Sequence, residues 1–208
     1  MDSAYNLSEQ EKHLIDYFFD NDCLKFGEYK LKTGKTSPFY INLRNLISKP
    51  DIINKISKLI YETFLESRKN ITLCGLPYAG IPYSCSISTL YEIPQILLRK
   101  EKKQYGDSLG KIYEGTHKVG NKMILIDDIF TTGSSIIDSI KKFQVEGILV
   151  DEVIVIINRN EKTNYMRKLK DYGIRVNFMF DLIDIIKYLL STNKINESEF
   201  KMVMNYLS

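Results

Sequence analysis

The chain has no tryptophan and few of the residues that build disulfide frameworks and metal sites. Its 208 residues include two histidines and three cysteines. Cys23, Cys74 and Cys85 are odd in number and form no CxxC pair, so a zinc site would have few candidate ligands. These absences exclude small disulfide-rich folds and indicate a reducing, intracellular setting.

Long apolar runs and a one-sided charge are also lacking. The longest apolar candidate, residues 147–157, is interrupted by Asp151 and Glu152, which excludes a membrane span. The polar, acidic N-terminal segment is unlike a secretory signal. Lys and Arg number 29 against 26 Asp and Glu, a balance that does not indicate nucleic-acid binding. We therefore expect a cytoplasmic protein that binds neither nucleic acid nor membranes.

Most of the chain alternates between short apolar runs and helical patterns. A capping box at Ser8 opens one helix, and two extended stretches follow at 26–31 and 39–43. Pro50 opens another helix. Apolar runs then occur at 71–74, 96–98, 123–126, 153–157 and 174–180, and helical patterns at 182–190 and 197–206 close the chain. This alternation predicts a single α/β domain with a mainly parallel central sheet flanked by helices.

The most informative segment runs from Met123 to Ser135. An apolar run ends in Asp127 and Asp128, and a turn rich in hydroxyls and glycine then leads into an amphipathic helix pattern. Backbone N–H groups and the positive end of a helix dipole favour a phosphate at such a turn. The two carboxylates suit ribose hydroxyls. An ordinary strand and helix with a Ser or Thr cap is the alternative, but the residues at 131–135 favour a phosphorylated sugar.

A second loop is dense in cations. Arg99, Lys100, Lys102, Lys103 and Lys111 share a stretch without helical or strand periodicity through residue 115. Loops of this length are usually functional or disordered, so a solvated charge run is the alternative to a site for a polyanion. Because ligands of open α/β sheets bind beyond the carboxyl ends of the strands, we expect the loops after 71–74, 96–98, 123–126 and 153–157 to meet at one crevice.

A nucleotide-hydrolysing function is excluded by spacing. The end of a phosphate-binding Walker A loop is resembled by Gly34, Lys35 and Thr36. That motif also requires a glycine five positions before Gly34, and this position is occupied by Tyr29. This segment also lies between two extended stretches, without a helix following it.

Residues 127–135 resemble the phosphoribosyl diphosphate (PRPP) motif of type I phosphoribosyltransferases. Three further matches narrow the resemblance to the orotate phosphoribosyltransferases: residues 26–34 with Ser37 and Pro38, residues 99–101 with Lys103 and Gly106, and Asn158 with Arg159. The resemblance runs from about residue 23 to 190, and residues 74–78 are closest in pattern to the orotate phosphoribosyltransferase domain of eukaryotic UMP synthase.

This resemblance implies the type I phosphoribosyltransferase fold and an activity. It implies a small N-terminal hood of about 1–48, a core of about 49–190 and C-terminal helices at about 181–208. The implied enzyme transfers the phosphoribosyl group from PRPP to orotate in pyrimidine biosynthesis, giving orotidine 5′-monophosphate and pyrophosphate. The family uses Mg²⁺ and forms homodimers with shared active sites. Since 208 residues leave no room for a decarboxylase half, association with a separate orotidine 5′-monophosphate decarboxylase is possible.

The resemblance also implies a role for each matching residue. The catalytic residues would be Lys103, Lys100 and Arg99. PRPP would be bound by Lys32, Tyr78, Ala79, Arg99, Lys100, Lys103, Tyr105, Asp127, Asp128, Ile129, Phe130, Thr131, Thr132, Gly133, Ser134 and Ser135. Orotate would be bound by Lys32, Tyr40, Ile41, Thr131 and Arg159. No protein metal-ligand set is implied, because Mg²⁺ would be held mainly through PRPP, near Asp127 and Asp128.

The sequence departs from the bacterial pattern at three positions. Bacterial members usually have His at the position of Tyr105, Lys at the position of Ala79 and Asp at the position of Gln104. These differences change the expected pyrophosphate contacts. Two other functions share the PRPP motif. A purine phosphoribosyltransferase should lack the cationic loop and the Lys32 and Arg159 pattern, and a PRPP-sensing regulator should lose the loop cations.

Overall fold

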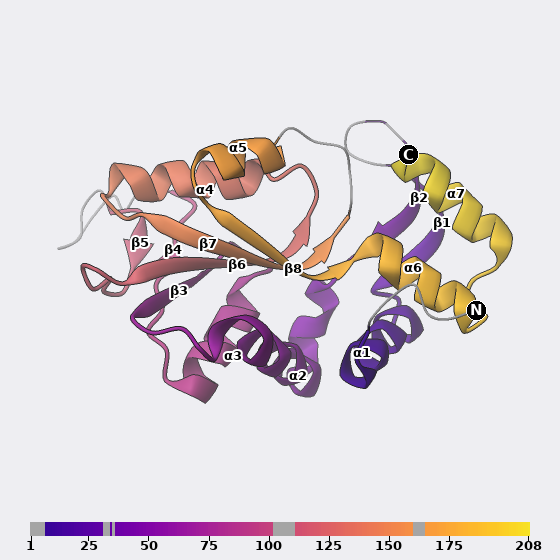
Figure 1. Ribbon diagram of the computed structural model, residues 1–208, viewed down its shortest axis with the longest axis horizontal. Coiled ribbons are helices and arrows are strands. Elements are labelled where there is room, and N and C mark those ends of the chain that lie inside the picture. The colour runs from indigo at the N-terminus through magenta and orange to yellow at the C-terminus, as the bar shows by residue number, and fades with distance from the viewer. Residues whose placement is uncertain (1–6, 31–33, 35, 102–110, 160–164) are drawn as a thin grey trace. The chain divides into compact units, whose positions relative to one another are not determined.

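A computed structural model of the chain describes residues 7–30, 34, 36–101, 111–159 and 165–208 (Figure 1). The chain forms two compact units. Unit 1 comprises residues 1–45, 159–162 and 180–208, and unit 2 comprises residues 46–158 and 163–179. Among the helices of the described segments, none combines the length and apolarity that a membrane span requires.

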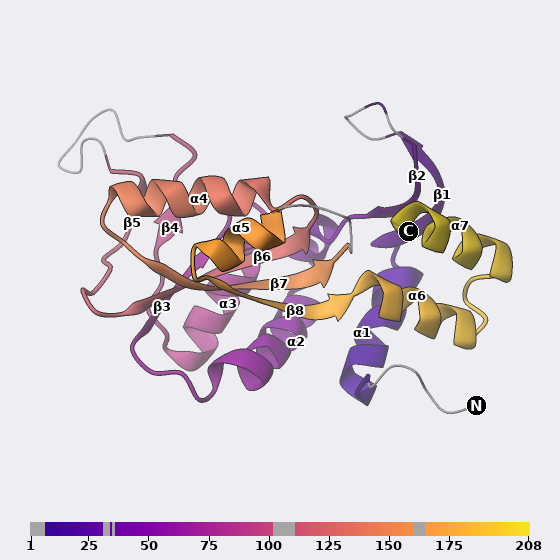
Figure 2. The ribbon, with the colours of Figure 1, turned by 45° about the horizontal axis from the view of Figure 1, so that its top comes forward.

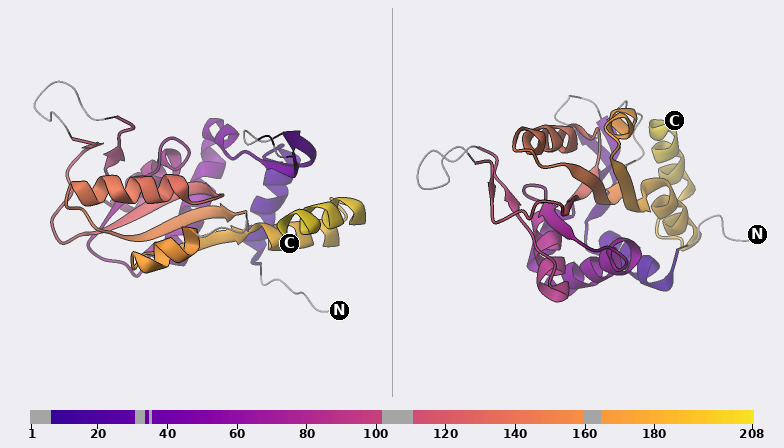
Figure 3. Two further views of the ribbon diagram at one scale, coloured as in Figure 1. Left: turned by 90° about the horizontal axis from the view of Figure 1, so that it is seen from above. Right: turned by 60° about the vertical axis from the view of Figure 1, so that its left-hand side comes forward.

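Unit 2 is built around a four-stranded sheet. Its strands are β3 (Ile71–Gly75), β6 (Lys122–Phe130), β7 (Val150–Asn158) and β8 (Arg175–Asp181), in the order β3-β6-β7-β8. β6 pairs in parallel with both β3 and β7. One face is covered by α2 (Pro50–Ile60), its π-helical extension (Tyr61–Leu65) and α3 (Ile81–Tyr91), and the other by α4 (Ser134–Val145) and α5 (Tyr165–Asp171), as Figure 2 and the right view of Figure 3 show. The predicted α/β class with a parallel sheet between helices is confirmed.

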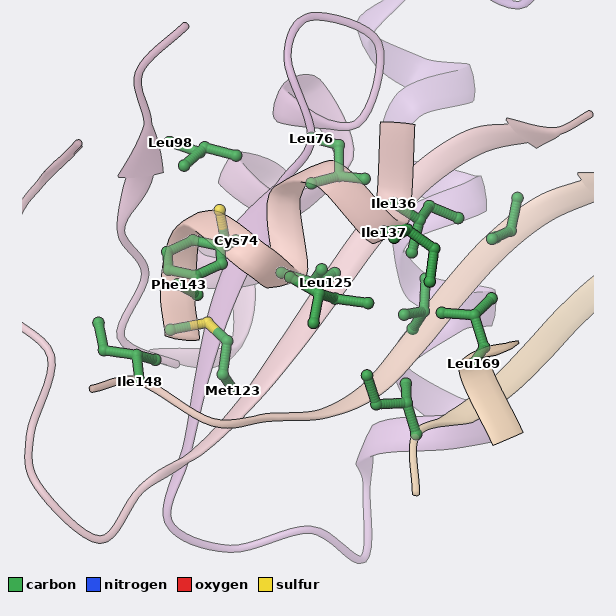
Figure 4. Close-up of a cluster of buried hydrophobic side chains, with 14 of the residues drawn as sticks. Cys74, Leu76, Leu98, Met123, Leu125, Ile136, Ile137, Phe143, Ile148 and Leu169 are labelled. Atoms are coloured by element: carbon green, nitrogen blue, oxygen red, sulfur yellow. The ribbon is translucent and has the colours of Figure 1, made fainter. Parts of the chain in front are cut away.

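Apolar side chains bury both faces of this sheet. Met123 and Leu125 of β6 pack in one cluster with Ile136, Ile137 and Phe143 of α4 (Figure 4). Because successive side chains of a strand point to opposite faces, Ile124 and Ile126 are directed to the other face, where they are also buried. Cys74 belongs to the α4-facing cluster, and burial raises the pKa of its thiol to about 12, so it serves as a packing residue.

The run at 96–98 does not join the sheet as a full strand. β4 (Leu97–Leu98) pairs antiparallel with β5 (Tyr113–Glu114), and in the described residues the main sheet is reached through one parallel bridge, between Leu73 and Gln95. The prediction of another parallel strand was therefore wrong, and β5 forms within a stretch that has no strand periodicity in the sequence. Two-residue strands have no periodicity that a sequence could display.

Unit 1 contains a β-hairpin and three helices. The elements are α1 (Glu9–Asp20), β1 (Leu24–Lys30), β2 (Thr36–Ile41), α6 (Leu182–Ser191) and α7 (Glu197–Leu207), and a short 3₁₀ helix (Arg44–Ser48) follows the hairpin. The predicted cap is confirmed, since the Ser8 hydroxyl accepts the Glu11 N–H at 3.3 Å and the Glu11 carboxylate accepts the Ser8 N–H at 2.7 Å. Antiparallel pairing of β1 with β2 aligns Leu24 with Ile41 and positions the end of β2.

Candidate functional site

The two predicted ribose-binding carboxylates lie inside β6. Pairing with β7 continues past Ile126 and aligns Asp127 with Val155 and Phe130 with Asn158. The strand was predicted to end at Ile126, which is wrong. The extension follows from β7, which is buried through Ile157 and provides a partner for the acidic residues. Ile129 and Phe130, also predicted to contact PRPP, therefore belong to the strand.

Both carboxylates are buried and oriented by the backbone. Asp127 is 9% exposed and Asp128 is 8% exposed. The Asp127 Oδ1 accepts the N–H of Asp128 at 3.0 Å, and the Asp128 Oδ1 accepts the N–H of Ile129 at 2.8 Å. These hydrogen bonds fix the orientation of each carboxylate. An acidic pair held in this way suits hydroxyl groups of a ligand, which would donate to it.

The turn after β6 forms the start of α4. Gly133, in the left-handed conformation with φ 80°, precedes the helix and has no side chain with which to cap it. The hydroxyls of Thr132 and Ser134 lie 3.1 Å apart and are exposed, as is Ser135. A helix N-terminus bordered by hydroxyls and preceded by glycine is suited to an anion. The turn and helix start predicted for this segment are thus present, and phosphate binding by residues 131–135 stays a prediction.

The loop after β3 is held tightly against β6. The Leu76 N–H donates to the Ile126 carbonyl at 2.8 Å, and the Gly80 N–H donates to the Leu76 carbonyl at 2.9 Å. A Cβ atom at Gly80 would lie 2.0 Å from the Ile126 oxygen, so only glycine fits. The peptide bond between Pro77 and Tyr78 is cis. Tyr78, a predicted PRPP contact, is 66% exposed on this loop, with Ala79 beside it.

Arg99 and Lys100 lie beside this loop. A pocket of about 400 Å³ is lined by Pro77, Tyr78, Ile81, Leu98, Arg99, Lys100 and Glu101. The Lys100 Nζ lies 3.9 Å from the centre of the Tyr78 ring, and the Lys100 carbonyl accepts from Lys142 Nζ of α4 at 3.2 Å. The structure therefore brings the first and second predicted loops together. The meeting of all four loops stays a prediction.

The predicted orotate contacts that the structure describes in unit 1 lie near one another. Tyr40 and Ile41 end β2, and the Arg159 guanidinium lies 4.8 Å from the ring centre of Phe39 in the same strand. Phe39 is fully buried, so it provides a fixed surface for the guanidinium. Sequence reasoning missed Phe39, although its place beside Tyr40 could have indicated it. Lys32, Lys103 and Tyr105 lie outside the described residues.

The sequence analysis also missed Glu114. Its Oε1 accepts from Arg99 Nη1 at 2.5 Å, which pairs it with one of the predicted catalytic cations. An acidic residue near the end of a cationic stretch was the available signal. The described residues contain no group of three or more His, Cys, Asp or Glu that could hold a metal ion.

The phosphoribosyl transferase domain family matches residues 43–181. Orotate phosphoribosyltransferase of Chlamydia caviae is 31% identical over 197 residues, which cover 93% of this chain and 94% of that protein. Bovine uridine 5′-monophosphate synthase is 31% identical over 195 residues, 93% of this chain but 40% of that protein. The chain thus spans about two fifths of the length of the UMP synthases that it matches.

Solved structures show the same architecture. UMP synthase of Leishmania donovani superposes with a TM-score of 0.81 at 28% identity, covering 94% of this chain and 42% of that one. Orotate phosphoribosyltransferase of Francisella tularensis gives a TM-score of 0.74 at 24% identity over 93% of this chain and 96% of that one. At the latter identity, the likeness concerns the fold alone.

Proposed function

The chain belongs to the phosphoribosyltransferase family and, within it, to the orotate phosphoribosyltransferases, and from this premise we propose that it transfers the 5-phosphoribosyl group of PRPP to orotate in pyrimidine biosynthesis. The products are orotidine 5′-monophosphate and pyrophosphate. The observation that carries the proposal is the arrangement at the end of β6, where two buried carboxylates precede a glycine-led helix start bordered by hydroxyls.

Each part of this arrangement suits one part of PRPP. The carboxylates of Asp127 and Asp128 accept hydrogen bonds from the ribose hydroxyls, and residues 131–135 bind the 5′-phosphate. Arg99 and Lys100, with Lys103, bind the pyrophosphate oxygens through charge-assisted hydrogen bonds. Tyr78 and Ala79 contribute from the neighbouring loop, and Lys32 and Tyr105 contact PRPP from segments outside the described residues.

The reaction exchanges one bond at ribose C1 for another. The bond from C1 to the pyrophosphate oxygen breaks, C1 gains carbocation character, and the electron pair leaves with pyrophosphate. The ring nitrogen of orotate supplies the electron pair of the new C1–N bond, and its proton leaves to solvent or to the departing pyrophosphate, so no protein side chain is assigned as a general base. Cations around the departing pyrophosphate stabilise the charge that builds there.

The residues present fit a bound Mg²⁺. This ion prefers oxygen ligands and is typically held by one or two carboxylates together with substrate phosphates. Asp127 and Asp128 provide such carboxylates beside the phosphate turn. Bound through PRPP near these two residues, Mg²⁺ would neutralise pyrophosphate charge.

Recognition of orotate is assigned to Tyr40, Ile41, Thr131, Arg159 and Lys32. The guanidinium of Arg159 matches the orotate carboxylate as a bidentate pair. Backbone groups of Tyr40 and Ile41 bond the polar edge of the ring. A purine has no such carboxylate, so this pairing favours orotate.

A direct assay separates this function from its alternatives. The protein is incubated with PRPP, Mg²⁺ and either orotate or hypoxanthine, and loss of orotate absorbance and formation of pyrophosphate are followed. Orotate consumption with matching pyrophosphate release is expected. Turnover of hypoxanthine alone would indicate a purine enzyme, and PRPP binding without any turnover would indicate a regulator.

Arg159→Lys is expected to raise KM for orotate by about 10- to 100-fold, because lysine cannot form the bidentate pair and each charge-assisted bond is worth about 1.5–3 kcal/mol. KM for PRPP should change little. Steady-state kinetics with each substrate varied separately measure both values. Arg167→Lys, at an exposed position of α5, is the matched control. An unchanged orotate KM in Arg159→Lys would contradict the assignment.

We also propose a homodimer with shared active sites. Lys142, which bonds the Lys100 carbonyl, lies in α4 about 12 Å along the helix axis from Ser134 at ~1.5 Å per residue. The backbone at Lys100 is therefore bound to α4 far from the N-terminal turn that is proposed to bind the 5′-phosphate. This placement supports a role for the cations in the site of the other subunit.

Mixing two inactive variants tests the sharing of sites. Lys103→Ala and Asp128→Asn impair different halves of each shared site, so a mixed dimer contains one intact site. After subunit exchange of equal amounts, activity is expected to recover to about a quarter of wild type, since half of the dimers are mixed and one site in each works. Orotate consumption is measured before and after mixing. No recovery despite subunit exchange would indicate sites made within one subunit.

We further propose a cytoplasmic enzyme that works with a separate orotidine 5′-monophosphate decarboxylase. The fused UMP synthases among its relatives support this pairing, because the chain matches about two fifths of their length.

A further inference from the structure

The Arg99 side chain is held from two directions. Its Nη1 donates to Glu114 Oε1 at 2.5 Å, and its Nε lies 3.4 Å from the Glu101 carbonyl oxygen. Its backbone N–H donates to the Ile112 carbonyl at 2.7 Å. A guanidinium is planar and its donors form a rigid fork. Contacts at two of its nitrogens therefore set both the plane of the group and the direction of its remaining donors.

Glu114 is itself held in place by the backbone. It lies in β5 and pairs with Leu97 of the antiparallel strand β4. Leu97 in turn precedes Arg99 by two residues. Gly115 follows with φ 96°, and a Cβ there would lie 3.2 Å from the Gln95 carbonyl oxygen. The chain after Glu114 thus packs closely on the start of β4. The carboxylate and the guanidinium that it binds are fixed to the same two-stranded ladder.

Stability does not explain this pair well. The Arg99 side chain is 38% exposed and the Glu114 side chain 43% exposed, and half-exposed ion pairs contribute little to folding. A carboxylate next to an anion-binding cation should also weaken anion binding by Coulomb repulsion. Its presence beside a predicted pyrophosphate ligand therefore calls for a compensating benefit.

We propose that Glu114 is a positioning residue that aims the Arg99 guanidinium at the pyrophosphate group of PRPP. The proposal rests on the proposed function and extends it to a residue outside the matched motifs. Glu114 acts through Arg99 and touches no substrate. The order that it imposes on the guanidinium before binding lowers the entropy lost on binding, and this gain exceeds the repulsion from its charge.

Two alanine substitutions distinguish positioning from simple charge. Glu114→Ala removes the partner of Arg99, whereas Glu101→Ala removes a nearby carboxylate and leaves its backbone carbonyl in place. If only charge mattered, both variants would bind pyrophosphate slightly more tightly. Positioning predicts different outcomes for the two variants. The Kd for Mg²⁺–pyrophosphate rises about 5- to 10-fold in Glu114→Ala, as expected for one lost orienting hydrogen bond, and is unchanged or lower in Glu101→Ala.

Calorimetric titration of the full chain with Mg²⁺–pyrophosphate and with PRPP gives the affinities. A double-mutant cycle with Arg99→Ala supplies the decisive readout. Because Glu114 acts through Arg99, Glu114→Ala should not weaken binding further once Arg99 is alanine, and loss of its negative charge should at most tighten binding slightly. Additive effects would overturn the proposal. Glu114→Gln keeps an acceptor oxygen and should recover most of the affinity, and a midpoint of thermal unfolding close to wild type excludes a general loss of structure.

The proposed function and the positioning role of Glu114 can be rejected independently. If the wild-type protein bound neither Mg²⁺–pyrophosphate nor PRPP, the proposed function itself would be wrong. If wild type bound both and Glu114→Ala behaved like Glu101→Ala, the proposed function would stand and the positioning role would be rejected.

Discussion

Replacement of Lys103 by alanine is expected to lower kcat by about 10²- to 10³-fold, the range seen when one group that stabilises transition-state charge is removed. Charge on pyrophosphate increases as its bond to ribose breaks, so an ammonium group aimed at those oxygens contributes more in the transition state than in the bound substrate. PRPP affinity should therefore change much less, since Arg99 and Lys100 still bind the ground state.

Single-turnover and steady-state assays separate these two effects, with PRPP affinity measured by calorimetry. Lys118→Ala is a suitable control because it removes the same charge from an exposed position between β5 and β6. Near-wild-type turnover in Lys103→Ala would refute a catalytic role for the cationic segment. A large loss of PRPP affinity with unchanged kcat would show that Lys103 binds the substrate without favouring the transition state.

The second large effect is expected from Gly80→Ala. Gly80 has helical backbone angles, φ −76° and ψ −21°, that alanine adopts readily. The obstacle is space alone, since the new Cβ would lie 2.0 Å from the Ile126 carbonyl oxygen and 2.7 Å from the Leu76 nitrogen. Both are backbone atoms, so the loop must move away from β6. Overpacking of this kind costs about 1–3 kcal/mol, and the shift would displace Tyr78 and Ala79 from the proposed site.

We expect Gly80→Ala to be less stable than wild type and to have a kcat/KM for PRPP at least about 10-fold lower. A displacement of substrate-binding groups by ~1 Å can reduce the rate by this much or more. Denaturant unfolding and steady-state kinetics measure the two losses. Gly173→Ala is the matched control: a Cβ at Gly173 meets nothing within 4 Å, and the strain of its left-handed φ of 71° is the main penalty. That variant should lose about 1 kcal/mol of stability and retain activity. Full activity in Gly80→Ala would show that the loop does not contribute to the site.

The central strand and the turn into α4 were predictable because their signals are local. An apolar run, two acids and a glycine-containing turn occupy consecutive positions, and each has a direct physical meaning. The end of β6 was not predictable in the same way. Asp127 and Asp128 have polar side chains that suggest a loop, yet pairing with the long apolar strand β7 keeps them in the sheet. Partner strands are chosen by the tertiary fold, which no local pattern contains.

Contacts between distant residues were the other feature that the sequence concealed. Arg99 and Glu114 are fifteen positions apart, and Phe39 and Arg159 are separated by most of the chain. Several acids lie near Arg99 in sequence, and nothing in their spacing distinguishes Glu114 from Glu101. The distinction arises from the β4–β5 ladder, whose strands are too short to leave a recognisable pattern.

One helix contacts two of the segments that are proposed to bind PRPP. The N-terminus of α4 follows the turn that is proposed to bind the 5′-phosphate, and Lys142, further along the helix, donates to the Lys100 carbonyl. A rigid element in contact with two ligand-binding segments can transmit a shift at one to the other, and any resulting coupling is reciprocal. A sugar phosphate that tightened pyrophosphate binding twofold would itself be bound twofold more tightly when pyrophosphate was present. For the proposed reaction, the helix thus offers a thermodynamic linkage through which the two products would influence each other's release.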